Sequence, residues 1–401
     1  MPARRILILT NRVPYPLNDG GNIAMNVMVE GYKKAGWLVC LLSMNTTRHY
    51  VEQEELAQIY QDIQFETVDV DNEIKPVPTL LNFLFTTRPN HADRFRHRGF
   101  AEKLEEVLHS FLPEVVQVES VFLSGYLRLI KAVSPLTVLR LHNIEYEIWQ
   151  RLAAETKGSL KKFYLRNLAA RICKYEYHAW SQYDLLLPIT GTDAGIAKKF
   201  NNNVLTIPFG IDTSVIDRSG NGELSAYHIG AMDWMPNADA MRWFLEEIWP
   251  SVHWELPRLK FYYAGRNMPP AFREMQVEGA ICAGEVPDAD VFIRDKKILV
   301  VPLRSGGGIR VKILEAMAAG KIIVCTAVGM QGIDAIPGKH YFAANTPAEF
   351  IDALKWIHAH SGEVQEMANE ARLFVQMKYD KDALMQQLID KIDNMLVENQ
   401  L

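Results

Sequence analysis

The chain has 401 residues, more than a single hydrophobic core usually serves, so two domains are expected. Its 48% hydrophobic and 23% charged residues are ordinary for a globular protein, and a formal net charge of −5 argues against non-specific nucleic-acid binding as the main activity. The four cysteines lie far apart without CxxC or Cys/His spacing. This spacing argues against a zinc site and a disulfide framework, and it predicts four small buried side chains.

The N-terminus leads at once into a short apolar run, residues 6–9, which is too short for the apolar region of a secretion signal. No segment reaches the roughly 18 apolar residues that a membrane-spanning helix needs. We therefore expect a cytoplasmic protein.

Short apolar runs and longer helical patterns alternate along the first half of the chain. Residues 6–9 are apolar at successive positions, as in a strand buried on both faces of a parallel sheet. A helix is predicted over 26–36, where Val29 and Tyr32 share one stripe and Gly36 is the stop signal. Further strands are predicted at 39–42, 115–118, 137–141 and 185–189.

The alternation restarts near residue 205, with strands predicted at 226–230, 259–264, 280–282, 298–302 and 322–326 and helices at 238–249 and 309–319. We predict an α/β protein of two Rossmann-like, doubly wound domains, residues 1–203 and 204–376. Residues 377–401 contain a long amphipathic helix. It either ends the chain in solvent or packs across the domains, back over the N-terminal one; its apolar stripe is Leu384, Leu388, Ile392 and Leu396.

A glycine-rich segment follows the predicted strand 298–302. Gly306, Gly307 and Gly308 carry no Cβ, so a phosphate can approach their backbone closely. Free N–H groups at the start of the next helix, near Ile309, point toward such a group. The alternative is a tight strand-to-helix turn without a ligand, and the segment is neither a Walker A nor a GxGxxG motif.

Charged residues surround this loop. Arg304, Arg310 and Lys312 add three positive charges, which favours phosphate binding over a simple turn. Glu315, about one turn into the helix, has a carboxylate that can accept two hydroxyl hydrogen bonds from a ribose.

Candidate site residues also follow strands of the first domain. Gly20 and Gly21 lie between the first strand and the first helix, where the alternative is an Asn/Asp-capped turn. His142 follows the strand 137–141, at the edge where ligand sites of α/β sheets gather, although a lone histidine is often only a structural hydrogen bonder. Glu119 follows the strand 115–118 at the same edge and is a weaker candidate for an acceptor contact.

Two further sequence patterns each allow more than one interpretation. Two Asp-x-Asp triplets, at 69–71 and 288–290, are interpreted as surface residues, because neither follows a suitable core strand. The apolar segment 78–85 is followed by clustered arginines. It is interpreted as a core helix with a solvated basic end, the alternative being docking on an anionic membrane; residues 161–174 give a weaker version of the same pattern.

The segment SGGGIRVKILEAMAAGKIIVCTAVGMQGI resembles the donor-binding signature of family 4 retaining glycosyltransferases, also called glycosyl transferase group 1, which have the GT-B fold. The resemblance extends over nearly the whole chain, through NRVPYPLNDGGNIAMNVMVEGYKKAGWLV, RLHNIEYE, IPFGID and IGAMDWMPNADAMRWFLEEIWP. It implies two Rossmann-like domains facing a central cleft. It also implies transfer of a sugar, with retention of the anomeric configuration, from a nucleotide-diphosphate donor to a hydroxyl acceptor.

The resemblance assigns roles to the matched residues of the first domain. Gly20 and Gly21 would face the donor diphosphate and the acceptor. His142 would hydrogen-bond a hydroxyl of the transferred sugar. The acceptor would be a sugar or a lipid-linked sugar, with cell-surface polysaccharide or glycoconjugate synthesis as the destination and with peripheral contact to the inner face of the membrane as an option.

In the second domain, Arg310 and Lys312 would bind the diphosphate and Glu315 the ribose. Glu285 and Val286, in AGEVPD, would lie where the backbone reads the base. The family needs no metal or other cofactor, because cations and a helix terminus neutralise the leaving diphosphate.

Two departures from the family pattern leave alternatives open. Gly307 stands where a second carboxylate usually holds the donor hexose, and the usual Arg and Lys pair after the first strand of the second domain is replaced by Asp233, Trp234 and Asn237. The alternatives are a catalytically silent nucleotide-sugar binding subunit and a nucleotide-sugar epimerase of the same fold. The sequence has no recognisable pyridoxal-phosphate motif, which argues against a phosphorylase. It also has no GxGxxG motif, which argues against a nicotinamide oxidoreductase.

Overall fold

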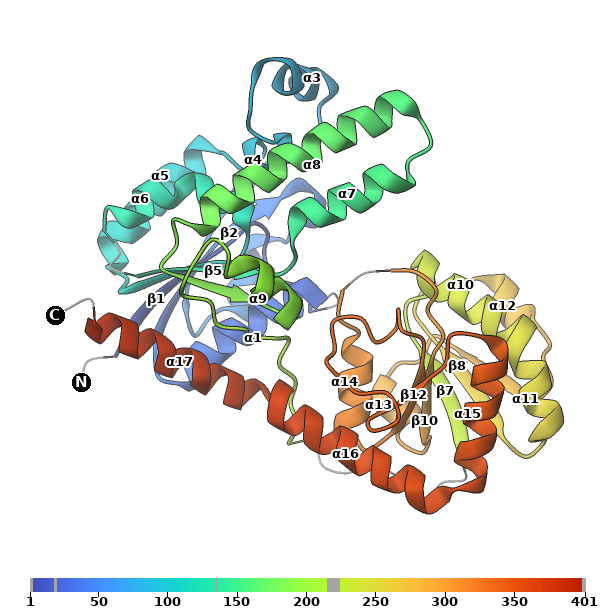
Figure 1. The fold of residues 1–401 in the computed structure, drawn as a ribbon. Coiled ribbons are helices and arrows are strands. Elements are labelled where there is room, and N and C mark those ends of the chain that lie inside the picture. The colour runs from blue at the N-terminus through green and yellow to red at the C-terminus, as the bar shows by residue number, and fades with distance from the viewer. Residues whose placement is uncertain (1–2, 18–19, 134–135, 215–223, 307, 399–401) are drawn as a thin grey trace. The chain divides into compact units, whose positions relative to one another are not determined.

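The computed structural model describes residues 3–17, 20–133, 136–214, 224–306 and 308–398. The chain forms two compact units (Figure 1): unit 1 is Met1–Gly210 with Asp382–Leu401, and unit 2 is Ile211–Lys381. The sequence placed the boundaries a few residues earlier, after 203 and 376.

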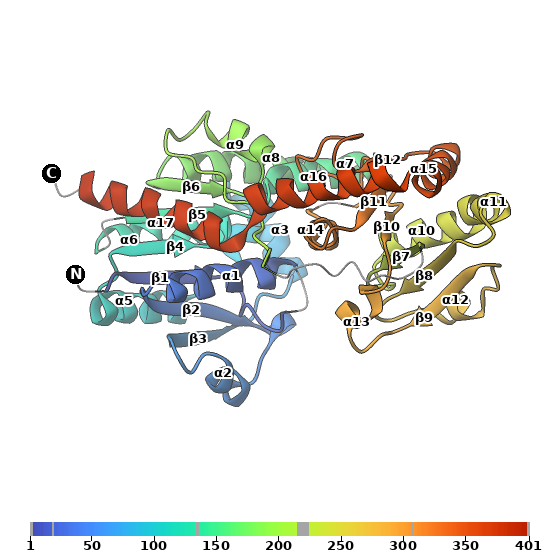
Figure 2. The same cartoon turned by 90° about the horizontal axis from the view of Figure 1, so that it is seen from below.

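Unit 1 is built on a parallel sheet of six strands in the order β3-β2-β1-β4-β5-β6 (Figure 2). The central strands are buried on both faces, which explains their unbroken apolar runs. The strands are β1 (Arg5–Thr10), β2 (Leu38–Thr46), β3 (Gln64–Val70), β4 (Val115–Val118), β5 (Leu136–Leu141) and β6 (Leu185–Pro188).

Helices cover both faces of this sheet. One face packs on α5, α6, α8 and α9, and the other on α1, α2 and α17. The helices of unit 1 are α1 (Gly20–Lys34), α2 (Gln53–Ile59), α3 (Pro76–Phe85), α4 (Asn90–Asp93), α5 (Arg98–Phe111), α6 (Leu127–Lys131), α7 (Glu145–Glu155), α8 (Ser159–Trp180), α9 (Gly191–Ala197) and α17 (Lys381–Glu398), with short 3-10 turns at Thr47–His49 and Val121–Tyr126.

Unit 2 has a second parallel six-stranded sheet, in the order β12-β11-β10-β7-β8-β9. Its strands are β7 (Ser225–Ile229), β8 (Lys260–Ala264), β9 (Ala280–Gly284), β10 (Ile298–Val301), β11 (Ile322–Cys325) and β12 (Phe342–Ala343). Its helices are α10 (Met235–Trp243), a π-helical turn (Phe244–Ile248), α11 (Trp249–Glu255), α12 (Pro270–Glu274), α13 (Ala289–Ile293), α14 (Val311–Ala318), α15 (Pro347–Ala359) and α16 (Ser361–Tyr379).

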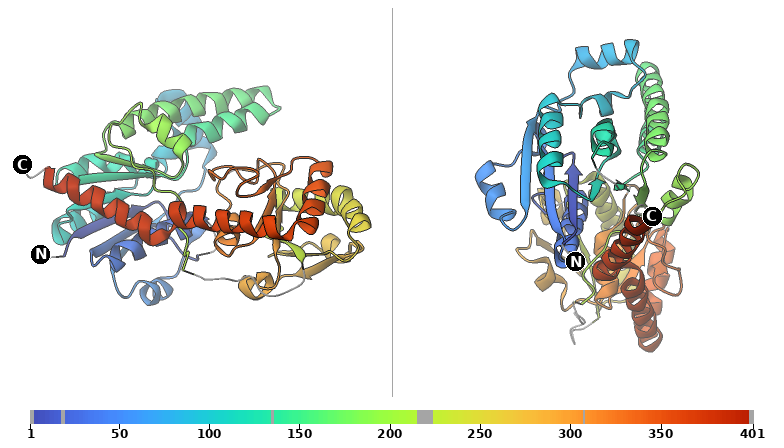
Figure 3. Two further views of the ribbon diagram at one scale, coloured as in Figure 1. Left: turned by 60° about the horizontal axis from the view of Figure 1, so that its bottom comes forward. Right: turned by 90° about the vertical axis from the view of Figure 1, so that its left-hand side faces the viewer.

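The C-terminal helix α17 belongs to unit 1 from Asp382 onward (Figure 3). Its predicted apolar stripe is buried, and Leu388, Ile392 and Leu396 enter the core shared with α1 and β1. A Cβ on Gly31 of α1 would lie 2.4 Å from Met385, so the two helices are in close contact. The chain thus ends by completing the core of the unit in which it began.

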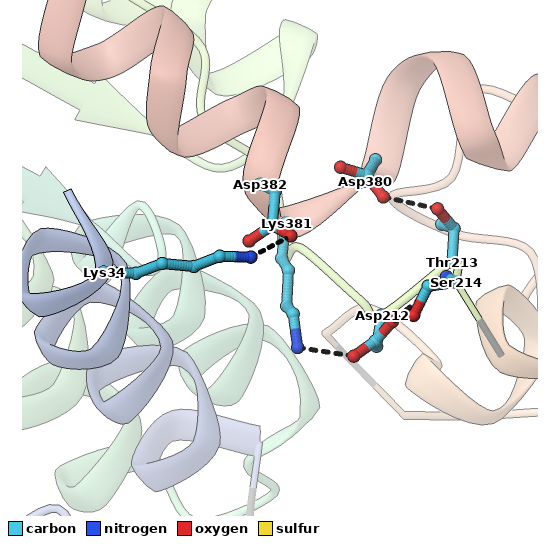
Figure 4. Close-up of polar contacts among 7 residues, drawn as sticks. All are labelled: Lys34, Asp212, Thr213, Ser214, Asp380, Lys381 and Asp382. Atoms are coloured by element: carbon cyan, nitrogen blue, oxygen red, sulfur yellow. Dashed lines mark hydrogen bonds and ion pairs between the residues drawn. The ribbon is translucent and has the colours of Figure 1, made fainter.

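The segments at which the chain enters and leaves unit 2 are joined to each other. Ile211 N donates to Tyr379 O at 2.8 Å, and Lys381 N donates to Ile211 O at 2.9 Å. Side chains reinforce this pairing, since Lys381 Nζ lies 2.7 Å from Asp212 and the Thr213 hydroxyl donates to Asp380 (Figure 4). In unit 1, an ion pair of 2.5 Å from Lys34 to Asp382 ties the start of α17 to α1.

Candidate functional site

The strand order of unit 2 reverses between β7 and β10, because β8 and β9 lie on one side of this pair and β11 and β12 on the other. Loops leaving the carboxyl ends of two such strands diverge, and parallel α/β sheets bind ligands at this point. One loop begins at Gly230 after β7. The other is the predicted glycine-rich loop between β10 and α14.

Lys312, in the first turn of α14, reaches the end of β7. Its ammonium donates to Ile229 O at 2.8 Å and lies 3.4 Å from Nε2 of His228. His228 is buried, and burial holds its pKa well below the ordinary value. Its Nδ1 lies 2.8 Å from Val300 O, which leaves Nε2 of the neutral ring as an acceptor for Lys312.

The charge of Lys312 is sensitive to what binds beside it. Burial, and secondarily the charge of Arg310, lower the pKa of Lys312 to about 7. An anion placed next to the ammonium would raise this pKa again, because an opposite charge favours the protonated form. The residue is therefore suited to binding a phosphate with uptake of a proton.

Arg310 lies immediately before α14 and is 7% exposed. Its guanidinium carbon is 5.3 Å from the ring centroid of Trp234, and Nη1 donates to Gly308 O at 2.6 Å. Gly306 has φ 118° and Gly308 has φ 82°, in the region that favours glycine. A Cβ on Gly306 would lie 2.9 Å from both Arg310 and Trp234, so the glycine lets the loop backbone lie directly against the cation.

The other predicted residues of unit 2 lie around this loop or after β9. Ile309 is partly buried in the loop, Glu315 is exposed one turn along α14, and Gly307 lies outside the described residues. Glu285 is exposed after β9, where it accepts from Asn267 N at 3.4 Å, and Val286 beside it is partly buried.

Arg304 differs from the other two cations. Its Nε and Nη2 donate to the two carboxylate oxygens of Asp239 at 3.0 and 2.6 Å, and its guanidinium packs over Trp243. The sequence predicted that Arg304 contributes its charge to phosphate binding, but in the structure this charge is paired with Asp239.

Unit 1 contains a cavity of about 740 Å³ at the carboxyl ends of its strands. The strand order reverses here between β1 and β4, so the cavity lies at the corresponding position of the first sheet. Gly21, Glu119 and His142 line it, whereas Gly20 is the exposed first residue of α1. Four arginines also line it: Arg12, Arg48, Arg94 and Arg140.

Glu119 and His142 form a hydrogen-bonded pair at the wall of this cavity. His142 Nε2 lies 2.7 Å from Glu119 Oε2, and the carboxylate is buried. Burial alone would raise the pKa of Glu119, but the hydrogen bond from His142 and the charge of Arg140 outweigh it and lower the pKa. An ionised carboxylate only accepts hydrogen bonds, so Nε2 carries the proton and Nδ1 is left as an acceptor.

The pair extends into a polar chain that the sequence did not reveal. Gln117 Nε2 donates to Glu119 Oε1 at 2.5 Å, and Tyr32 donates to Gln117 Oε1 at 2.7 Å. Arg140 is 2% exposed, and its Nε and Nη1 have no hydrogen-bond partner among the described residues. These residues lie on β4, β5 and α1 inside apolar runs, so their spacing carried no signal.

A second buried carboxylate, Glu176 of α8, positions the helix that follows His142. Its oxygens accept from the backbone N–H groups of Glu145 and Tyr146 at 3.0 and 2.8 Å, which satisfies the start of α7. Burial raises the pKa of Glu176 to about 8 and that of Glu145 to about 7.

The Asp-x-Asp triplets take part in local contacts. Asp71 pairs with Lys75 at 2.7 Å, and Asp288 caps α13 by accepting from Asp290 N at 2.7 Å. Within the part of the chain that the structure describes, no group of three or more His, Cys, Asp or Glu side chains is placed to hold a metal ion. All four cysteines are free; Cys40 and Cys325 are buried, and Cys173 and Cys282 are partly buried.

Comparisons with known proteins agree with this architecture. Residues 224–360 match the family model described as glycosyl transferases group 1. A curated Klebsiella pneumoniae protein, described as an uncharacterized 44.6 kDa protein in a cps region, is 21% identical over 387 residues, which cover 94% of this chain and 96% of that protein.

Solved structures are similar over nearly the full length. Sucrose-phosphate synthase from Thermosynechococcus elongatus has a TM-score of 0.66 at 14% identity, with 98% of this chain and 100% of that chain covered. The Anabaena protein HepE, in complex with UDP, has a TM-score of 0.65 at 10% identity, with 97% and 100% covered. The predicted GT-B fold is therefore confirmed for both units. The match to the group 1 glycosyl transferase model lies within unit 2, at residues 224–360.

Proposed function

We propose that this protein transfers a glycosyl residue from a nucleotide-diphosphate sugar to a hydroxyl acceptor, with retention of the anomeric configuration. The observation that carries the proposal is the placement of Arg310 and Lys312 beside a glycine loop, at the position where the strand order of unit 2 reverses. Two cations at such a position are suited to a diphosphate leaving group. HepE was solved with UDP and with UDP-glucose, which supports a uridine nucleotide as the first donor to test.

The mechanism that we propose relies on positioning and charge. Arg310 and Lys312 neutralise the diphosphate as its bond to the sugar breaks, and Glu315 holds the ribose hydroxyls. A phosphate oxygen of the donor takes the proton of the attacking hydroxyl, so the protein supplies no nucleophile. His142 hydrogen-bonds a hydroxyl of the transferred sugar through Nδ1, while Glu119 holds its Nε2.

The acceptor that we propose binds the cavity of unit 1. A volume of about 740 Å³ accommodates a sugar, and its mixture of arginines, carboxylates and amides is suited to hydroxyl groups. The relative from a cps region supports a role in polysaccharide or glycoconjugate synthesis.

The test combines donor binding with product analysis. A panel of nucleotide sugars is screened by thermal shift, since a true donor raises the melting temperature by mass action. The initial product is then examined by NMR, and retention requires the same anomeric configuration as the donor. We expect Arg310→Ala and Glu315→Ala to lower transfer at least about 100-fold, while the matched control Arg304→Ala stays within about threefold, because Asp239 already holds that guanidinium. Full activity in both site variants would refute the donor site.

A second candidate is a nucleotide-sugar binding subunit without transferase activity. Gly307 favours it, because a glycine cannot supply the carboxylate that the family usually has at this position. Slow hydrolysis of the bound donor by purified wild-type protein, lost in Glu315→Ala, would decide for the enzyme.

A further inference from the structure

Helix α3 and the first turns of α8 expose a group of large apolar side chains. The apolar pattern of residues 78–85 predicted a core helix, and this prediction is wrong, because only Asn82 of α3 is buried. Phe85 is 78% exposed and Leu160 is 86% exposed. We call this group the apolar surface, and its members are Val77, Leu80, Leu81, Leu84, Phe85, Leu160 and Phe163.

The apolar surface is held in place by contacts between its two helices. The ring of Phe83 lies 5.5 Å from that of Tyr164, centroid to centroid, and 6.4 Å from that of Phe163. Arg171 of α8 donates to Asn82 O at 3.1 Å and to Phe83 O at 2.7 Å, which satisfies carbonyls at the end of α3. The exposed side chains therefore project from a fixed support; Figure 1 shows α3 beside α8, standing away from the sheet of unit 1.

Positive charge predominates along the two segments that carry the apolar surface. The sequence contains no Asp or Glu between Glu73 and Asp93, and none between Glu155 and Glu176. These two stretches carry the cations Lys75, Arg88, Lys157, Lys161, Lys162, Arg166, Arg171 and Lys174. Lys161 and Arg166 are exposed next to Leu160 and Phe163 on α8.

We infer that the apolar surface docks on a bilayer of anionic lipids. Leucine and phenylalanine side chains can enter the boundary between headgroups and acyl chains, and each flanking Lys or Arg adds about 1 kcal/mol of attraction to an anionic leaflet. A second copy of the chain is a poorer partner, because it would bring two cationic surfaces together. Among the described helices, none combines the length and the apolar character that spanning a bilayer requires.

Docking here would bring lipid close to the acceptor cavity. Asn72, Glu73 and Ile74 line the cavity and lead directly into α3, and Ile74 is itself 62% exposed. Arg94, which also lines the cavity, donates to Asn72 O at 3.0 Å and holds this segment. This step rests on the proposed function: the acceptor is a lipid-linked sugar whose headgroup enters the cavity from the bilayer.

The experiment measures co-sedimentation of the full-length protein with vesicles of phosphatidylcholine containing 30% phosphatidylglycerol, and with vesicles of pure phosphatidylcholine. We expect the wild type to partition onto the anionic vesicles and to lose this binding in high salt. Leu84→Ser/Phe85→Ser should lower the partition coefficient about tenfold or more, and Lys161→Glu/Arg166→Glu should do so on anionic vesicles. Trp254→Ser, in unit 2, is the matched control, because Trp254 is 87% exposed and outside the apolar surface.

Two outcomes would overturn the inference. One is wild-type binding in both double variants, and the other is concentration-dependent dimerisation that the Leu84→Ser/Phe85→Ser variant abolishes while vesicles remain unbound. The assay requires no turnover, so its failure leaves the proposed function intact. If the wild type docks on vesicles, the same variants should lower the rate of sugar transfer to a lipid-linked acceptor, while the thermal shift caused by the donor stays unchanged. An unchanged transfer rate would refute the lipid-linked acceptor but not the docking itself.

Discussion

Replacing Glu119 by glutamine tests what His142 does, because the substitution keeps the volume of the side chain and removes its charge. The Glu119 carboxylate accepts from both Gln117 and His142, at 2.5 and 2.7 Å. A glutamine can still accept from Gln117 with its carbonyl oxygen, and its amide then donates toward His142. Nε2 of His142 must become an acceptor, so the ring proton moves to Nδ1, the atom that faces the substrate in our proposal.

The size of the effect distinguishes two roles for His142. If His142 only hydrogen-bonds a hydroxyl of the transferred sugar, the hydroxyl can reverse the direction of that bond, and the loss is about one hydrogen bond. That is about 1.4 kcal/mol, or about tenfold in kcat/KM. If His142 is the base that deprotonates the acceptor, the wrong tautomer costs about 10⁴-fold. Under the retaining mechanism we expect the tenfold loss.

The assay measures kcat/KM for wild type, Glu119→Gln, His142→Ala and the double variant. In the His142→Ala background Glu119→Gln should have no further effect, because Glu119 acts through the imidazole. Nitrogen-15 NMR of the His142 ring should show the proton on Nε2 in the wild type and on Nδ1 in Glu119→Gln.

A separate consequence for stability must be controlled. The substitution leaves the buried guanidinium of Arg140 without the charge of Glu119, which destabilises the fold by about 3 kcal/mol. Activities are therefore compared well below the melting temperature of the variant. Equal activity of Glu119→Gln and wild type, with the tautomer unchanged, would refute the role of the pair, and a loss of 10³-fold or more would refute retention with the donor phosphate as base.

Two further predictions concern unit 2. Because burial lowers the pKa of Lys312 to about 7, the unfolded chain binds more protons between about pH 7 and its unfolded pKa of 10.5, so this residue makes stability rise with pH over that window. Binding of a nucleoside diphosphate should require the protonated form. Calorimetry in buffers of different ionisation enthalpy should then show that the protein takes up a proton on binding near pH 8. The dissociation constant should increase up to about tenfold per pH unit above 7, and Lys312→Met should show neither effect. A pH-independent affinity in the wild type would contradict this prediction. Gly265→Ala should destabilise the protein by more than about 2 kcal/mol in denaturant unfolding, because the new Cβ would lie 1.7 Å from Gly230 O, whereas Gly195→Ala, with open space around its Cβ, should be neutral or slightly stabilising. Equal stability of the two variants would show that β7 and β8 can separate at this point.

The sequence by itself determined the central strands of both sheets. Strands buried on both faces must be apolar at successive positions, so β1, β4 and β10 were predictable within a residue or two from local runs alone. The edge strand β3 was missed because it is only partly buried. Its polar and apolar residues are mixed, so it lacks the continuous apolar run from which the central strands were predicted. The edge strand β12 was missed because it has only two residues.

The glycine loop and its cations could also be recognised from sequence, because they are consecutive and their chemistry is local. The partners of those residues could not be recognised, since parallel pairing brings together side chains that are distant in the chain. Val118 of β4 lies opposite Leu139 of β5, and this register places Glu119 within reach of His142. In the same way, β7 lies beside β10 and receives Lys312 from the helix that follows β10.

The exposure of α3 was likewise decided only by the tertiary structure. Its apolar residues satisfy the pattern of a core helix, but the faces of the unit 1 sheet are filled by other helices. Periodicity reports which side chains are apolar, whereas the space left by the rest of the fold decides which of them reach the core.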